Sequence, residues 1–172
     1  MFILVTGASG QLGRSIKNLV EKSKVSHSFI FVSRDQLDLS YLKGIRIYFK
    51  DHKFDLIINC AAYTKVDKAE LHERQANLIN HLAVRQIAEI AQSNNIKLIH
   101  ISTDFVFDGL KQQLYFEEDT PLPLNIYGKT KLAGENAILS IMKTNASIIR
   151  TSWVYSEYGN NFVDTILRLI QK

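Results

Sequence analysis

Residues 2–13 read Phe-Ile-Leu-Val-Thr-Gly-Ala-Ser-Gly-Gln-Leu-Gly, or FILVTGASGQLG. The apolar start is typical of a buried strand, and residues 11–22 then carry apolar side chains at helical spacing. Between them stand Gly7, Gly10 and Gly13, spaced G-x-x-G-x-x-G. Such glycines allow a tight turn and let the backbone approach a pyrophosphate at the helix N-terminus. A glycine-rich turn without a ligand is the plain alternative, but the position between strand and helix favours a dinucleotide site.

Outward from this loop, strands and helices alternate along the chain. Strands are expected at residues 2–5, 29–32, 56–59, 98–102 and 146–150, and helices at 11–22, 41–50, 78–91, 129–142 and 161–169. Because the strands are almost entirely apolar, they predict a parallel sheet covered by helices on both faces. The expected fold class is α/β, a Rossmann-type doubly wound parallel sheet forming one dinucleotide-binding domain over residues 1–172. Residues 108–125 hold both prolines and are expected to form a long loop outside the sheet.

The end of the second expected strand bears on the choice of cofactor. Ser33-Arg34-Asp35 stands there, where an acid commonly holds ribose hydroxyls and an arginine holds a 2′-phosphate. Arg34 favours NADPH, and NADH stays open. Asp38 and Leu39 follow shortly and are placed to pack beside an adenine, although Asp38 suits a helix cap equally well.

Composition narrows the remaining classes of protein. The chain has 172 residues and a net charge of +4, with basic residues scattered rather than clustered, which argues against nucleic acid as a partner. No apolar run reaches the length of a membrane span, and the first residues lack signal-peptide features, so we expect no membrane partner and a cytoplasmic protein. The single cysteine, Cys60, rules out an internal disulfide. The five histidines lack metal-ligand spacing, so no metal site is expected, and His100 is expected in the core.

Residues 125–131, Asn-Ile-Tyr-Gly-Lys-Thr-Lys, place Tyr127 and Lys131 four positions apart near the start of an expected helix. A nearby ammonium favours phenolate, so such a pair makes a general acid able to protonate a carbonyl oxygen. A hydroxyl that holds this oxygen is available in Ser102-Thr103, at the carboxyl end of the fourth expected strand. Tyr-x-x-x-Lys arises often by chance on helices. The order of glycine loop, strand-end hydroxyl and Tyr–Lys pair favours catalysis over chance.

Five segments together resemble the extended short-chain dehydrogenase/reductase family. They are ILVTGASGQLG, INCAAYTKVDKAE, HISTDFVFDG, PLNIYGKTKLAGE and RTSWVYSEYGNNF, and they run from residue 3 to 162. Within the family the chain is similar to enzymes that use NAD(P)H to reduce the C4 ketone of dTDP-4-dehydro-L-rhamnose. The resemblance therefore implies an oxidoreductase of nucleotide-sugar synthesis for cell-surface polysaccharide, with a dTDP-sugar as substrate.

The resemblance also implies roles for individual residues. Thr103 is expected to bind the ketone oxygen, Tyr127 to donate the proton, and Lys131 to tune Tyr127. The implied cofactor contacts are Gly7, Gly10, Gln11, Leu12, Gly13, Ala61, Ala62, Tyr63, Tyr127 and Lys131. The implied substrate contacts are Thr64, Val66, Thr103, Phe105 and Trp153. Phe105 stands where the family usually has tyrosine, which removes one possible sugar contact. For Trp153 the alternative is a core residue, but its place at the carboxyl end of an expected strand favours the site.

The length of the chain leaves the dimer and magnesium open, and other functions of related proteins stay open as well. Family members continue well beyond Lys172, so most of the C-terminal substrate lobe is expected to be missing, together with much of the dimer contact and the magnesium ligands of some members. A homodimer is therefore left open, and Mg²⁺ is implied only for a longer form. The alternatives are a nucleotide-sugar epimerase or dehydratase of the same family, and a non-catalytic NADP-binding regulatory subunit like the β-subunit of methionine adenosyltransferase.

Overall fold

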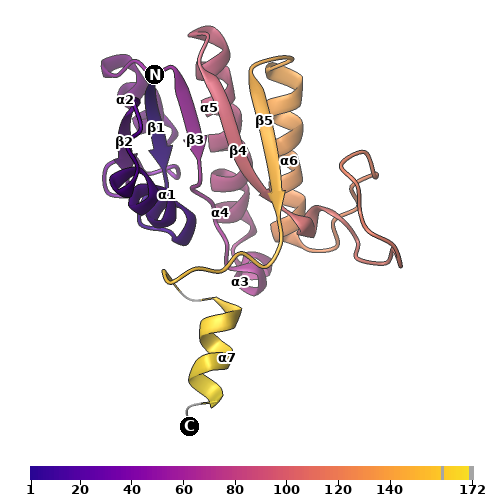
Figure 1. Cartoon of the computed structure of the whole chain (residues 1–172). Helices are drawn as coiled ribbons and strands as arrows, with labels where there is room; N and C mark the ends of the chain where they lie inside the picture. Colours follow the sequence, from indigo (N-terminus) through magenta and orange to yellow (C-terminus); the bar gives the residue numbers. More distant parts are fainter. Residues whose placement is uncertain (160, 171–172) are drawn as a thin grey trace.

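The computed structural model describes residues 1–159 and 161–170. Its centre is a five-stranded parallel sheet (Figure 1). In chain order the strands are β1 (Phe2–Thr6), β2 (Ser28–Val32), β3 (Leu56–Asn59), β4 (Lys97–Thr103) and β5 (Ala146–Thr151). Their order across the sheet is β2-β1-β3-β4-β5, so the direction of winding reverses between β1 and β3. In open sheets of this kind ligands bind beyond the carboxyl ends of the strands at that reversal.

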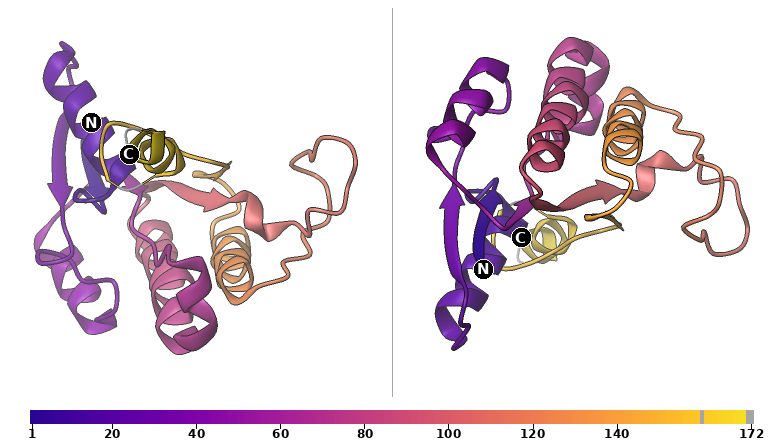
Figure 2. Two further views of the ribbon diagram at one scale, coloured as in Figure 1. Left: turned by 90° about the horizontal axis from the view of Figure 1, so that it is seen from below. Right: turned by 90° about the horizontal axis from the view of Figure 1, so that it is seen from above.

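Helices cover both faces of the sheet, as the alternating pattern predicts. On one face α2 (Leu42–Asp51), α5 (Ala83–Ser93) and α6 (Ile126–Ile141) pack side by side, while α1 (Gln11–Lys22) lies on the other (Figure 2). The main core forms between the three-helix layer and the sheet, where Leu4, Ile57 and Leu98 of the strands meet Ile87 and Ile138 of the helices. These side chains are 1% exposed or less, which makes this layer the rigid base of the molecule.

The helix expected at residues 78–91 begins earlier and is irregular. After α3 (Val66–Leu71), α4 (Glu73–Asn77) runs into a π-helical turn, η1 (Leu78–Leu82), and only then into α5. The wide turn accompanies an inward Asn80, whose amide accepts from the backbone N–H of Tyr63 at 2.8 Å and donates to its carbonyl at 3.0 Å. An apolar repeat cannot reveal such a turn, because the turn keeps the helix axis and changes only one hydrogen-bond step.

The helix expected at residues 129–142 begins three residues earlier, as α6. Its N-cap is Asn125, whose side-chain oxygen accepts from the backbone N–H of Gly128 at 2.8 Å. Glu70 of α3 accepts from the N–H of Ile126 at 2.8 Å, so two of the free donors at this helix end are satisfied. The earlier start places Tyr127 in the first turn of the helix, directly below Lys131 in the next turn.

Two further segments lie outside the sheet. The loop between η2 (Asp104–Val106) and α6 projects to one side in Figure 1, which confirms the expected excursion. The last helix, α7 (Phe162–Ile170), lies beyond the carboxyl ends of the strands and has no buried residue. Over residues 1–159 and 161–170, no helix combines the length and apolar character needed to cross a membrane. In the same part of the chain, no three His, Cys, Asp or Glu side chains come together as a metal site would require.

Candidate active site

A cleft of about 830 Å³ opens at the carboxyl ends of the strands, beside the reversal between β1 and β3. The residues that the sequence singles out for a site line it, except Asp35. From the loops after β1 and β2 come Gly7, Gly10, Gln11, Leu12, Gly13, Arg34, Asp38 and Leu39. From the loops after β3, β4 and β5 and from α6 come Ala61, Ala62, Tyr63, Thr64, Val66, Thr103, Phe105, Tyr127, Lys131 and Trp153. The fold thus brings residues up to 146 positions apart to one edge of the sheet.

The glycine loop is packed too tightly for side chains. Gly7 has a φ of 68°, and a Cβ on it would lie 2.7 Å from the backbone nitrogen of Ala61. A Cβ on Gly13 would overlap the carbonyl oxygen of Gly7. The N-cap of α1, Gly10, provides no side-chain cap, and the first turn holds no acidic residue. The free N–H groups and positive dipole end of α1 therefore face the cleft, which fits a pyrophosphate.

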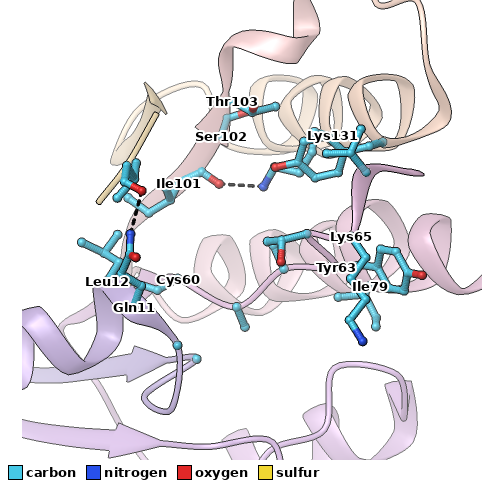
Figure 3. Close-up of a pocket in the computed structure, with 18 of the residues that line it drawn as sticks. Gln11, Leu12, Cys60, Tyr63, Lys65, Ile79, Ile101, Ser102, Thr103 and Lys131 are labelled. Atoms are coloured by element: carbon cyan, nitrogen blue, oxygen red, sulfur yellow. Dashed lines mark hydrogen bonds between the residues drawn. The ribbon is translucent and has the colours of Figure 1, made fainter. Parts of the chain in front are cut away.

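The segment after β5 crosses this loop. Gln11 donates through its side-chain amide to the carbonyl of Val154 at 2.9 Å, marked by a dashed line in Figure 3. Asn161 donates to the Gln11 side-chain oxygen at 3.2 Å. Trp153 lies in the same segment with a φ of 50° and is 74% exposed, so it is not the core residue of the alternative interpretation. Its indole meets the ring of Phe162 edge-on, with centroids 5.1 Å apart.

Arg34 and Asp38 form a pair at the far end of the cleft. The Arg34 Nε lies 3.4 Å from a carboxylate oxygen of Asp38. The other oxygen of Asp38 accepts from the backbone N–H and the hydroxyl of Ser40 at 2.8 and 2.7 Å. Burial raises the pKa of Asp38, but the Ser40 hydrogen bonds and the Arg34 charge together lower it below its ordinary value. The N-cap of α2 is Tyr41, so the capping alternative for Asp38 is wrong.

Tyr127 and Thr103 stand together at the centre of the cleft. Tyr127 is buried, with its ring edge-on to that of Phe105 at a centroid distance of 5.7 Å. The Thr103 hydroxyl donates to Asp104 at 3.1 Å and accepts from the N–H of Phe105 at 3.3 Å. Burial raises the pKa of the Tyr127 phenol above 10.0; the Thr103 hydroxyl acts against this rise and the Asp104 charge adds to it.

Lys131 is 2% exposed and is attached to the sheet. Its ammonium donates to the carbonyl of Ile101 at 2.6 Å, the second dashed line in Figure 3, and lies 3.3 Å from Nε2 of His100. Burial lowers the pKa of Lys131 to about 8, although the nearby Glu135 carboxylate acts in the opposite direction. The pKa of the Tyr127 phenol is raised by burial in this structure, and tuning of Tyr127 by Lys131 stays a prediction.

A buried ion pair holds α6 against β5. Glu135, one turn beyond Lys131, is 1% exposed and faces Arg150, whose Nε and terminal nitrogen lie 3.1 and 2.7 Å from its carboxylate oxygens. The guanidinium carbon of Arg150 also lies over the face of the Phe107 ring, 5.0 Å from its centre. Helix α6 is thereby fixed to β5.

Several properties of the residues at the cleft come only from the structure. The Ser102 hydroxyl is buried and lines the cleft, and it has no hydrogen-bond partner among residues 1–159 and 161–170. An orphaned hydroxyl of this kind fits a site built for a polar ligand. Cys60 is partly buried at the cleft, and burial raises its thiol pKa to about 12, so it stays neutral. His100 is fully buried as expected, but Asn59 and Lys131 engage both of its ring nitrogens. In the sequence, the available sign of these features was the presence of polar residues within otherwise apolar strands.

Comparison with known proteins shows which family has this fold and sequence. The family model described as RmlD substrate binding domain matches residues 1–172. A dTDP-4-dehydrorhamnose reductase of Aggregatibacter actinomycetemcomitans is 43% identical over 97% of the chain and 56% of its own length. A dTDP-4-keto-6-deoxy-D-glucose reductase of Streptomyces niveus is 38% identical over 98% of the chain and 58% of its own length.

Among solved structures, the dTDP-4-dehydrorhamnose reductase of Bacillus anthracis in complex with NADP is 38% identical. It superimposes with a TM-score of 0.92, covering 99% of this chain and 59% of that one. The chain thus spans a little more than half the length of the relatives that it matches. With a family model matched from end to end, the chain belongs to the RmlD substrate binding domain family.

Proposed function

We propose that the protein carries out the NADPH-dependent reduction of the C4 ketone of dTDP-4-dehydro-L-rhamnose to dTDP-L-rhamnose. The observation that carries the proposal is the single cleft that joins a side-chain-free glycine loop to Thr103, Tyr127 and Lys131. The relatives named as dTDP-sugar reductases support the substrate class. Since the chain spans little more than half of their length, the activity, the substrate and any partner all belong to this proposal.

The cofactor end of the cleft suits NADPH. The N–H groups at the start of α1 would hold the pyrophosphate, with Gln11 and Leu12 beside it. Arg34 would hold the 2′-phosphate, and Leu39 would pack by the adenine. The relative solved with NADP supports this choice over NADH. When bound, the nicotinamide supplies the hydride that reduces the ketone carbon.

The chain's own residues supply the proton and its control. Tyr127 would donate the proton of its phenol to the ketone oxygen, while the Thr103 hydroxyl holds that oxygen. Because burial keeps the phenol pKa above 10.0, the proton is present on Tyr127 at neutral pH. The Lys131 ammonium, one helical turn away, would stabilise the phenolate left after transfer. On the sugar side, the proposed contacts are Thr64, Val66, Phe105 and Trp153.

The first test is NADPH oxidation by the purified chain with dTDP-4-dehydro-L-rhamnose as substrate. Tyr127→Phe should lower the rate by at least about 100-fold, as loss of a general acid does. Tyr41→Phe is the matched control, since Tyr41 is 56% exposed, and should leave the rate unchanged. Equal rates for the two variants would remove Tyr127 from the mechanism.

Two further measurements separate the competing functions. Assaying dTDP-4-keto-6-deoxy-D-glucose in parallel asks whether the substrate of the Streptomyces niveus relative is preferred. A shift of the melting temperature by NADPH measures cofactor binding without turnover. Cofactor binding with no oxidation of either substrate would contradict the reductase proposal for this chain and favour the regulatory-subunit alternative. Interconversion of sugars without net NADPH oxidation would favour an epimerase.

A further inference from the structure

A row of buried polar side chains crosses three neighbouring strands. Thr6 of β1 pairs in register with Asn59 of β3, and Asn59 pairs with His100 of β4. Register partners in a parallel sheet point to the same face, so the three side chains form a ladder on the face that α2, α5 and α6 cover. All three are 1% exposed or less. Three adjacent polar side chains in an otherwise apolar core indicate a specific role, since each must find hydrogen bonds there.

The ladder is continuous from the glycine loop to the candidate catalytic lysine. The Thr6 hydroxyl accepts from the backbone N–H of Ala61 at 3.3 Å and meets the Asn59 side-chain oxygen at 2.6 Å. The Asn59 amide nitrogen lies 3.0 Å from Nδ1 of His100. The other ring nitrogen, Nε2, lies 3.3 Å from Nζ of Lys131. Lys131 is thus linked through three side chains to the segment packed on Gly7.

If every donor in the ladder must face an acceptor, two arrangements of its hydrogens are possible. A charged Lys131 only donates, so Nε2 of His100 must be bare and the ring hydrogen must sit on Nδ1. In that state the Asn59 amide is turned over relative to the orientation given above, with its oxygen toward Nδ1 and its nitrogen toward Thr6. A neutral Lys131 can instead accept from a hydrogen on Nε2, and Asn59 then donates to a bare Nδ1. The position of the hydrogen on His100 and the charge of Lys131 are therefore coupled.

We propose that His100 is a positioning residue for Lys131, accepting a hydrogen bond from its ammonium, and that the His100 tautomer follows the charge of Lys131. The inference rests on the proposed function, in which a charged Lys131 stabilises the Tyr127 phenolate. Ile101 and His100 hold two of the three ammonium hydrogens, which leaves one for the cleft. Without His100, the buried ammonium loses one of its two acceptors and its charged form becomes harder to keep.

Other ionisable groups around Lys131 define the setting of this coupling. They are Glu135 of α6, whose carboxylate acts on the pKa of Lys131, and Tyr127, Asp104 and Cys60, which line the same cleft. Glu135 is already paired with Arg150. Cys60 has a thiol pKa of about 12, so it stays neutral across the range of the test. Burial and the Lys131 charge lower the pKa of His100 well below its ordinary value, which keeps its ring neutral.

The direct test is the tautomer of His100, read from ring ¹⁵N chemical shifts in protein labelled at histidine. The His100 signals are identified by their absence from His100→Gln. The hydrogen is expected on Nδ1 at about pH 6.5 and on Nε2 above about pH 9, with the change centred near the Lys131 pKa of about 8. Lys131→Met should abolish the change. One tautomer throughout in the wild type, or a change that persists in Lys131→Met, overturns the proposal.

A pair of substitutions separates the two contacts of the ring in turnover. The Gln side-chain oxygen stands near the place of Nε2 and can accept from Lys131, whereas the shorter Asn reaches only toward Asn59. His100→Asn should move the alkaline limit of the rate to lower pH by about one unit, the effect of losing one hydrogen bond to a charged group. His100→Gln should restore the wild-type limit. Identical limits in the two variants would refute positioning by His100. Because the tautomer is measured without turnover, failure of the reductase proposal remains distinguishable.

Discussion

Lys131 should make the protein more stable in mildly alkaline solution than at neutral pH, and Lys131→Met should remove that gain. The residue is 2% exposed and is held on α6 against β4. Its charge is costly there because the protein interior solvates an ammonium less well than water does.

The magnitude follows from the pKa values. Burial lowers the pKa of Lys131 from 10.5 to about 8. Between these values the unfolded chain binds a proton that the folded protein has already released, so the free energy of unfolding rises with pH across this window. The full shift corresponds to about 3 kcal/mol, and the part gained between about pH 7 and pH 9.5 is about 2 kcal/mol.

The assay is urea unfolding followed by far-UV circular dichroism at several pH values in this range. The wild type should gain about 2 kcal/mol relative to Lys131→Met over the range, whereas Lys129→Met, a change at an exposed neighbour on α6, should keep the gain. Groups such as Cys60 and Tyr127 titrate in both proteins and cancel in the comparison. Parallel pH dependence in wild type and Lys131→Met would refute the reasoning.

Three further changes test the packing of the site. Gly13→Ala places a Cβ against the Gly7 carbonyl and should weaken NADPH binding at least about tenfold, measured by fluorescence titration. An unchanged affinity would contradict a close approach of the glycine loop to the cofactor. Arg150→Met leaves Glu135 buried without its partner and should lower the free energy of unfolding by about 3–5 kcal/mol. Changing Glu135 to Met as well should recover part of this loss. No recovery would argue against the ion pair as the cause. Asn125→Ala removes the N-cap of α6 and should cost about 1 kcal/mol in urea unfolding, whereas Asn125→Asp, which retains an acceptor, should cost less.

Much of the site follows from patterns that are local in the chain. The glycine spacing needs only a strand before it and a helix after it, and the Tyr–Lys spacing needs only one helix. The rule that parallel strands end at one edge then brings these motifs together, and the structure places them all in one cleft. Element ends were less accurate: the helix expected from residue 129 begins at Ile126, where the side chain of Asn125 caps it.

The sequence alone therefore determines the Rossmann-type fold, the glycine loop and the Tyr–Lys pair, because these depend on spacing and on apolar period, while the resemblance to a known family implies most of the other cleft residues. Only the tertiary structure decides what those residues do electrostatically. A pKa depends on burial and on neighbours that are distant in the chain, so the raised Tyr127 and the lowered Lys131 have no local signal. For the same reason His100 reads as an ordinary core residue, although strand register joins it to Asn59 and the packing of α6 joins it to Lys131.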